Sequence, residues 1–314
     1  KMVIEEKSIF LLGPTATGKT ELIKCLNKIF PIDIISVDSA QIYKFMDIGT
    51  AKPNKEELID TPHHLIDIRN PIESYSVGDF KKDVDIIIEK SSEIGKVPVL
   101  CGGTMMYFNA IERPLDSLPI STLETKKIVN DELNEFGIKY LFKKLKNIDP
   151  VSAGKINCND SQRIQRALEV YYISGKPLSV FYTNQIKPEA SCNILKIALF
   201  PTTRDRLHNV IEERATFMLK NGLIEEVENI LRMYPSIDES YSSIRAVGYR
   251  QAYHYLKDKI SKSDLKDKII FATRQLAKRQ ITWMRKMENL DIFEPYSHDL
   301  NLKVKSKVEE FLLN

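Results

Sequence analysis

The segment Gly13-Pro14-Thr15-Ala16-Thr17-Gly18-Lys19-Thr20 matches the phosphate-binding pattern G-x-x-x-x-G-K-[ST]. It follows the apolar run 8–12 and precedes the helical pattern 22–29, so it lies between a predicted strand and a predicted helix. The glycines let backbone N–H groups converge on phosphate oxygens, Lys19 adds positive charge, and the Thr20 hydroxyl can ligate Mg²⁺. The alternative is a glycine-containing turn with a surface lysine. The loop alone does not distinguish a bound triphosphate from a diphosphate.

Three further apolar runs predict strands, at 32–37, 97–100 and 194–200. Helical segments separate them along the chain. Strands that alternate with helices are typical of a mostly parallel sheet covered by helices. The fold class is therefore α/β, with a P-loop NTPase-like core.

Between residues 115 and 191 the strand pattern disappears and helical segments take over, notably at 121–136 and 161–174. We interpret this part as a helical insertion. The predicted domains are a catalytic core of residues 1–114 and 192–314 and an insertion of residues 115–191.

The composition, with 43% hydrophobic and 28% charged residues, is that of a globular protein, and no apolar run approaches the ~20 residues that span a bilayer. We expect a cytoplasmic protein without a membrane contact. The net charge is only +3, yet residues 241–286 hold twelve Lys or Arg against three Asp. This concentration of positive charge indicates a localised contact with a polyanion.

Polar residues follow the second and third predicted strands, in the segments Asp38-Ser39-Ala40-Gln41 and Gly102-Gly103-Thr104. In an open parallel sheet, ligands bind at the carboxyl ends of the strands, so these residues should meet the phosphate-binding loop in one cleft. An aspartate at a strand end is also common as a simple turn or helix cap, and Thr104 can be a cap in the same way.

Several longer segments resemble the signature of the tRNA dimethylallyltransferases, and together they run from about Ser8 to Lys286. The segments are 38–43, 46–53, 62–67, 75–80, 102–107, 160–169, 244–251 and 272–283. The bacterial form is the more similar one, because no zinc-finger extension of the eukaryotic type is seen.

The resemblance implies that residues Gly13, Pro14, Thr15, Ala16, Thr17, Gly18, Lys19 and Thr20 hold the diphosphate of dimethylallyl diphosphate, with Mg²⁺ on Thr20. The exocyclic amine of the adenosine 3′-adjacent to the anticodon attacks the allylic carbon, and diphosphate leaves. Lys19 and Arg214 would stabilise the charge of the leaving group. Without the resemblance, Arg214 reads as a surface arginine paired with Glu212 or Glu213.

An adenine amine is a weak nucleophile, so a carboxylate that accepts its proton should assist the displacement, and Asp38 is our candidate for that base. Thr104 would orient the amine or a phosphate oxygen. The target adenosine has to leave its stack to reach such a site, and Ser39, Ala40 and Gln41 are placed to hold its edges or those of its neighbours.

The family likeness and the basic stretch favour contacts with the tRNA anticodon stem-loop by residues of the insertion and of the C-terminal helices. These predicted tRNA contacts are Gln162, Arg163, Arg166, Arg245, Gly248, Arg250, Arg274, Lys278 and Arg279. Solvated helix faces are the alternative for all of them. We expect the enzyme to act as a monomer.

Three rival functions share part of this pattern. A small-molecule kinase would use the P-loop, but it does not explain the segment 38–41 or the basic helices. A non-catalytic RNA-binding module would leave the phosphate loop without a use. A prenyltransferase that acts on free adenine nucleotides would have no need of so large a basic surface.

Overall fold

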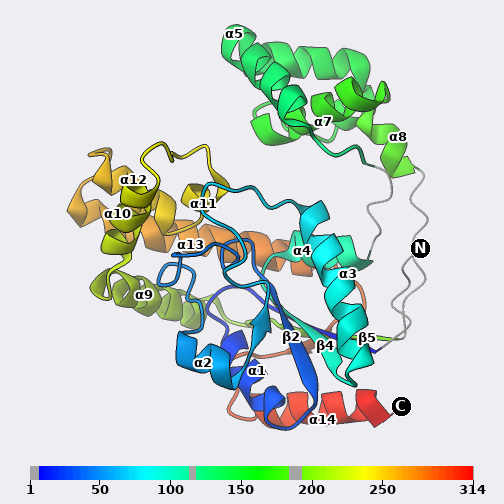
Figure 1. Cartoon of the computed structure of the whole chain (residues 1–314), viewed down its shortest axis with the longest axis vertical. Helices are drawn as coiled ribbons and strands as arrows, with labels where there is room; N and C mark the ends of the chain where they lie inside the picture. The colour runs from blue at the N-terminus through cyan, green and yellow to red at the C-terminus, as the bar shows by residue number, and fades with distance from the viewer. Residues whose placement is uncertain (1–6, 113–117, 184–192, 314) are drawn as a thin grey trace. The chain divides into compact units, whose positions relative to one another are not determined.

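The computed structural model describes residues 7–112, 118–183 and 193–313 (Figure 1). Two compact units make up the chain: Lys1–Glu112 with Ala190–Asn314, and Arg113–Glu189. Our predicted boundaries at 114/115 and 191/192 lie outside the described residues. None of the helices in the described ranges is long and apolar enough to cross a membrane.

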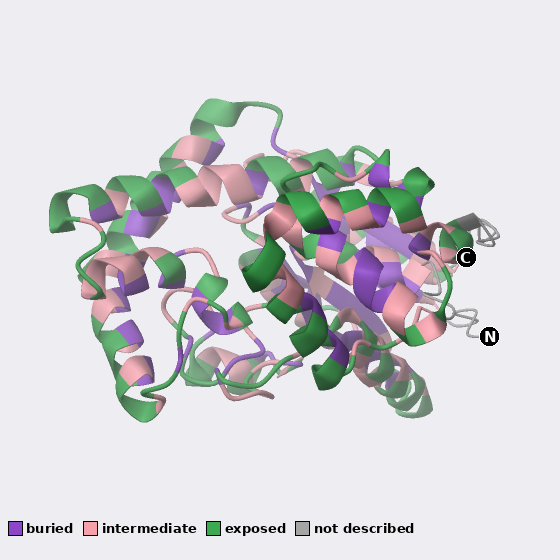
Figure 2. Ribbon diagram, turned by 90° about the horizontal axis from the view of Figure 1, so that it is seen from above, coloured by how far each residue is buried: buried purple, intermediate pink, exposed green. Residues whose placement is uncertain are grey.

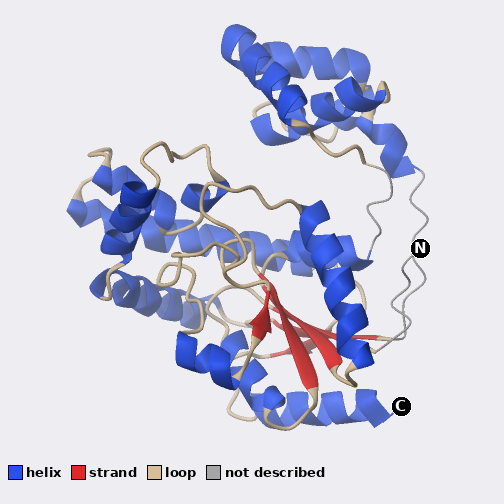
Figure 3. Cartoon of the chain, viewed as in Figure 1, coloured by secondary structure: helices blue, strands red, loops and turns tan. Residues whose placement is uncertain are grey.

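The larger unit is built on a parallel sheet of six strands in the order β3-β2-β4-β1-β5-β6, which confirms the predicted fold class (Figure 3). The strands are β1 Ser8–Leu12, β2 Ile32–Val37, β3 His63–His64, β4 Val97–Gly102, β5 Ile194–Leu199 and β6 Asp291–Phe293. Register places Gly102 beside both Leu12 and Val37, so three neighbouring strands end at the same level. The segments that follow them must therefore meet at one edge.

Helices cover both faces of the sheet because successive residues of each strand point to opposite sides. Helices α1 (Lys19–Asn27) and α14 (Leu300–Leu313) pack with Ile9 and Leu11 of β1. Helices α3 (Val77–Glu93) and α4 (Met105–Glu112) pack on the other face, where Phe10 and Phe108 have their ring centroids 5.2 Å apart. Figure 2 shows the buried strands between partly exposed helices.

A second helical group encloses the long loop that follows β2. Its core contains Ile42, Tyr43 and Met46 from this loop together with apolar residues of the surrounding helices. The group comprises α9 Arg204–Lys220, α10 Leu223–Met233, α11 Ser242–Arg245, α12 Tyr249–Leu256 and α13 Lys262–Met284, and the short helix α2 Lys55–Asp60 follows the same loop. The loop is thus a packed element, which fixes the segment that begins at Asp38.

The smaller unit is helical throughout its described residues. It consists of α5 Leu123–Ile148, α6 Pro150–Ala153, α7 Ser161–Ser174 and α8 Leu178–Thr183. Helix α5 breaks at Gly137, whose φ of 79° lies in the left-handed region that glycine adopts without strain. Val129, Leu141 and Ile164 lie in one core of this unit.

The sequence did not predict two edge strands. Strand β3 has two residues and β6 has three, which is too short for an alternating pattern to be recognised. Their pairing is set by neighbours far along the chain, since β3 pairs with β2 and β6 with β5.

Candidate active site

The phosphate-binding loop joins β1 to α1 and has the expected conformation. Ala16 (φ 66°) and Gly18 (φ 78°) are both in the left-handed region, so the chain curls back on itself. The Thr17 hydroxyl donates to the Pro14 carbonyl at 2.7 Å and closes the curl. A side chain on Gly13 would lie 3.0 Å from Leu199, so glycine lets the loop pass β5 closely.

Lys19 lies inside this curl. Its ammonium group donates to the carbonyls of Gly13 (2.9 Å) and Pro14 (2.7 Å). Burial lowers the pKa of Lys19 to about 8, and the nearby Arg214 guanidinium also lowers it, while the Asp38 carboxylate raises it. A desolvated cation whose hydrogen bonds within the described ranges go only to carbonyls is well placed to bind an anion, because an anion would replace weak acceptors with a strong one.

Arg214 on α9 reaches the same loop from 199 residues further along the chain. One guanidinium nitrogen donates to the Thr15 hydroxyl at 3.1 Å and the other approaches the Thr50 carbonyl at 3.5 Å. Burial lowers the pKa of Arg214, with Asp38 acting in the opposite direction. Within the described residues it forms no ion pair, and Glu212 lies instead 3.8 Å from Lys266. Arg214 is therefore not the surface arginine of the alternative interpretation.

Asp38 and Thr104 follow the neighbouring strands β2 and β4, as the parallel sheet requires. One carboxylate oxygen of Asp38 accepts from the backbone N–H groups of Ala40 (2.8 Å) and Gln41 (3.2 Å). The Thr104 hydroxyl accepts from the Ser39 N–H at 3.0 Å. Asp38 does cap a turn, but the cap uses Oδ1, and Oδ2 has no hydrogen bond within the described ranges. That second oxygen is available for chemistry.

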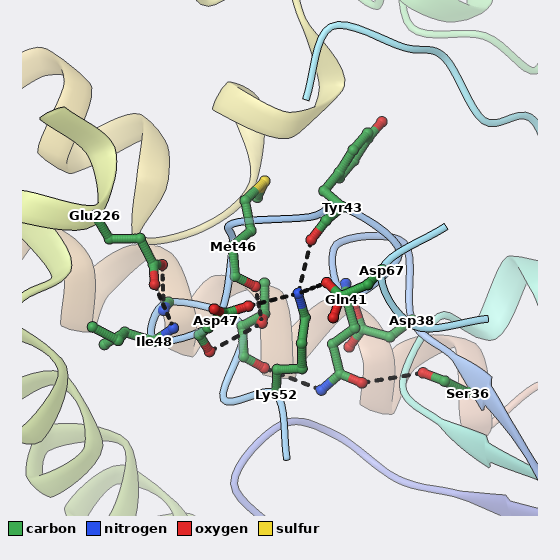
Figure 4. A network of polar contacts seen from close by, with 12 residues as sticks. Ser36, Asp38, Gln41, Tyr43, Met46, Asp47, Ile48, Lys52, Asp67 and Glu226 are labelled. Carbon is green, nitrogen blue, oxygen red and sulfur yellow. Dashed lines mark hydrogen bonds and ion pairs between the residues drawn. The ribbon is translucent and has the colours of Figure 1, made fainter. Parts of the chain in front are cut away.

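The loop from Asp38 to Lys52 is held by polar contacts on several sides (Figure 4). The Gln41 side chain accepts from the Ser36 hydroxyl at 3.1 Å and donates to the Thr50 carbonyl at 3.2 Å, so in the free protein it stabilises the loop. Ser39 is exposed and Ala40 half-buried beside it.

Two charged side chains that we did not predict hold the far end of this loop. The ammonium group of Lys52, a side chain only 2% exposed, donates to Asp67 (2.6 Å), Asp47 (2.9 Å) and the Tyr43 carbonyl (2.8 Å). Glu226 accepts from the Ile48 N–H at 2.9 Å. Lys52 lies in the segment 46–53 that the resemblance covers, and Glu226 lies in none of these segments. No local pattern indicates the partners of either side chain.

Two more unpredicted side chains contact the phosphate-binding loop. Gln280 of α13 accepts from the Thr15 N–H and donates to the Gly103 carbonyl. The Tyr296 hydroxyl donates to the Ala16 carbonyl at 3.0 Å. The only sequence signal for Gln280 is its place in the segment 272–283, and the local sequence around Tyr296 gives none.

Residues of the basic stretch differ in how accessible they are. Arg245, Arg250, Lys278 and Arg279 are exposed. Arg274 is half-buried, and its Nε is buried without a hydrogen-bond partner in the described part of the chain. Gly248 is buried at the start of α12, where its N–H donates to Gln251 at 2.8 Å.

The predicted tRNA contacts in the insertion also differ in their exposure. Gln162 and Arg163 are exposed on α7, and Arg163 pairs with Asp160 one turn earlier. Arg166 is turned toward its own unit, where it donates to the Pro119 carbonyl at 2.8 Å and also to the Ser121 hydroxyl. A tRNA contact by Arg166 would require these bonds to break.

The described residues contain no cluster of three or more His, Cys, Asp or Glu side chains that could hold a metal ion by themselves. Mg²⁺ is commonly held by one or two protein groups, with phosphate oxygens and water completing its shell. The Thr20 hydroxyl, in the first turn of α1 directly after the phosphate-binding loop, fits that kind of site.

The chain is similar to curated proteins that carry the same name. The tRNA dimethylallyltransferase of Nitrosococcus oceani is 45% identical over 298 residues, which is 95% of each chain. That of Legionella pneumophila (strain Lens) is 44% identical over 304 residues, covering 97% of this chain and 96% of the relative.

Solved structures agree. The tRNA isopentenylpyrophosphate transferase of Bacillus halodurans matches with a TM-score of 0.69 and 33% identity over 98% of each chain. A eukaryotic dimethylallyltransferase acting on tRNA, at 24% identity, shares the fold with a TM-score of 0.83 over 99% of this chain and 80% of its own. The sequence profile described as IPP transferase matches residues 41–287. This chain therefore belongs to the IPP transferase family.

Proposed function

We propose that this enzyme transfers the dimethylallyl group of dimethylallyl diphosphate to the N6 amine of the adenosine 3′-adjacent to the tRNA anticodon. The products are N6-isopentenyladenosine and diphosphate. The observation that carries the proposal is the meeting, at one sheet edge, of the phosphate-binding loop, the guanidinium of Arg214, which has no ion pair within the described residues, and the carboxylate of Asp38. The names of the curated relatives support it.

Each group has a distinct part in this reaction. Backbone N–H groups of the loop, Lys19 and Arg214 bind the diphosphate and stabilise its charge as the allylic C–O bond breaks. The Asp38 Oδ2 takes the proton of the amine as the N–C bond forms. Thr104, whose hydroxyl already accepts from Ser39, keeps a donor for the amine or for a phosphate oxygen. All these side chains come from one chain, so a monomer suffices.

Magnesium is the proposed cofactor, and the Thr20 hydroxyl would hold it. When bound, it would neutralise part of the charge on the leaving diphosphate.

The proposed tRNA contacts are the exposed members of the predicted set, Arg245, Arg250, Lys278 and Arg279 in the larger unit and Gln162 and Arg163 in the insertion. Arg274 remains a candidate because its buried Nε has no partner among the described residues. Ser39, exposed beside Asp38 and Thr104, is the proposed neighbour of the flipped adenosine.

A diphosphate-release assay tests the proposed function against the kinase alternative. The protein is incubated with Mg²⁺ and either dimethylallyl diphosphate or ATP, each with and without unmodified tRNA. We expect diphosphate release from the prenyl donor only when tRNA is present, and no turnover of ATP. Formation of ADP in a parallel incubation of ATP with a small acceptor, with the γ-phosphoryl group transferred to that acceptor and no diphosphate released from the prenyl donor, would support a kinase instead.

The lowered pKa of Lys19 predicts how diphosphate affinity changes with pH. In the free enzyme Lys19, with its pKa lowered to about 8, loses its proton above that pH, whereas a bound diphosphate anion favours the protonated form. Binding above that pH therefore takes up a proton, and the Kd should rise about tenfold per pH unit. Calorimetric titration with dimethylallyl diphosphate from about pH 7.5 upward, where phosphate groups are already ionised, measures this.

The matched control is Lys19→Arg, because a guanidinium stays charged in this range. Its Kd should be flat over the same pH interval. A parent enzyme with an equally flat Kd would contradict the lowered pKa of Lys19.

Neutralising the exposed cations of α13 should weaken tRNA binding through its ionic part. For Lys278→Gln with Arg279→Gln we expect the slope of log K against log salt to fall by about one unit for each lost phosphate contact. Filter binding at several salt concentrations gives the slope, and diphosphate affinity should not change.

The control for this pair is Lys90→Gln with Lys96→Gln, two exposed lysines near the opposite, amino-terminal end of β4. It removes the same charge and should leave the slope as it is. If the salt slope of the Lys278→Gln, Arg279→Gln variant equals that of the control variant and the parent, α13 does not contact the tRNA backbone.

A further inference from the structure

Gln280 joins two segments that follow neighbouring strands. Its Oε1 accepts from the Thr15 N–H at 3.0 Å, and its Nε2 donates to the Gly103 carbonyl at 2.9 Å. Thr15 belongs to the phosphate-binding loop after β1, and Gly103 to the turn after β4. An amide side chain has one acceptor and one donor group in fixed geometry, so it can satisfy both backbone partners at once.

Backbone contacts between these two segments become weak just past the strands. The last one is the Gly13 N–H to the Gly102 carbonyl, at a long 3.4 Å. Among the described residues, no backbone hydrogen bond beyond it joins the loop that would hold the diphosphate to the turn that carries Thr104. Gln280 makes the next polar connection between them.

Gly103 is shaped for this contact. A Cβ at Gly103 would lie 2.6 Å from the Gln280 Nε2 and 3.2 Å from the Gly13 carbonyl oxygen. The φ of Gly103 is not in the left-handed region, so the need for glycine there is one of space. A methyl group would displace the Gln280 amide from its place between the two segments.

We propose that Gln280 is a positioning residue that sets the distance between the diphosphate cradle and the strand ends that hold the adenosine amine. The inference rests on the proposed function, in which the leaving group lies on the Thr15 side and the nucleophile near Thr104 and Asp38. A displacement reaction needs its reacting atoms about 3–3.5 Å apart, and a misplacement of about 1 Å can cost 10²-fold in rate. Gln280 thereby acts on turnover without touching either substrate.

The test uses two variants that remove both hydrogen bonds. Gln280→Met keeps most of the side-chain volume, and Gln280→Ala removes it. We expect both to lower the single-turnover rate by about 10- to 10²-fold, with Kd values for tRNA and dimethylallyl diphosphate within about threefold of the parent. Ser263→Ala, at the exposed start of the same helix, is the control and should match the parent.

Two outcomes would overturn the inference. A Gln280→Met enzyme with the parent rate would mean that the residue only fills space, and a loss found entirely in substrate affinity would mean that it binds rather than positions. A parent that transfers no prenyl group under any condition would instead be a failure of the proposed function.

Hydrogen–deuterium exchange keeps the inference testable in that last case, because it does not depend on activity. The Thr15 amide should exchange slowly in the parent and faster in both Gln280 variants, and equal exchange would contradict the contact. Gly103→Ala adds a double-mutant cycle: it should slow turnover in the parent and add little in the Gln280→Ala background. Additive effects would show that the two residues act independently.

Discussion

Asp38→Asn is expected to reduce turnover by about 10²–10⁴-fold, the usual contribution of a general base, while the affinities for tRNA and prenyl diphosphate change little. The structure makes this substitution selective. The amide oxygen of asparagine can still accept from the N–H groups of Ala40 and Gln41, so the turn is kept and only the proton acceptor is lost. Single-turnover kinetics, equilibrium binding and thermal unfolding of one variant supply the three readouts.

The alternatives for Asp38 predict different patterns. A chiefly metal-binding Asp38 would change magnesium dependence and diphosphate affinity first, and a pure turn cap would change stability by about 1 kcal/mol with catalysis kept. Asp238→Asn is the matched control. Asp238 also caps a turn, since it accepts from the Ser240 N–H at 2.8 Å, but it is exposed and does not belong to the candidate site. Turnover of Asp38→Asn within a few-fold of the parent would exclude the general-base role.

Lys19→Ala is expected to lose about 10²–10³ in turnover, together with prenyl-diphosphate affinity, since it removes a preorganised cation from the leaving group. Arg214 reaches the loop from α9 and contacts the Thr15 side chain, whereas the Lys19 ammonium group contacts the Gly13 carbonyl. Arg214 therefore cannot replace Lys19 at its position. Steady-state kinetics and titration with the prenyl donor measure the two losses.

Lys28→Ala is the control for Lys19, because Lys28 caps the other end of α1 and is exposed. It should behave as the parent does. Near-normal kinetics in Lys19→Ala would remove the phosphate-binding loop from the mechanism.

The central part of the site could be predicted because its determinants are local. The loop from Gly13 to Thr20 has a contiguous motif, and Asp38 and Thr104 follow directly from the rule that ligands bind at the carboxyl ends of parallel strands. The structure places both residues in that edge, since Val37 and Leu12 flank Gly102 in the sheet.

The contacts of three other side chains could not be predicted from local sequence: Arg214, Lys52 and Gln280. Arg214 and Gln280 contact the loop from 199 and 265 residues away, and nothing in their own helices indicates which side chain turns inward. Arg214 was predicted only because the family likeness pointed to it. The inward turn of Arg166 also follows from tertiary contacts, which no charge count contains.

The most direct test of the proposed prenyl transfer is to identify its product. Unmodified tRNA is incubated with the protein, Mg²⁺ and dimethylallyl diphosphate, then digested and analysed by mass spectrometry, with Lys19→Ala in parallel. We expect a five-carbon increment on the adenosine 3′-adjacent to the anticodon, formed by the parent and almost absent with the variant. An unmodified adenosine at that position, or equal modification by both proteins, would contradict the proposed prenyl transfer.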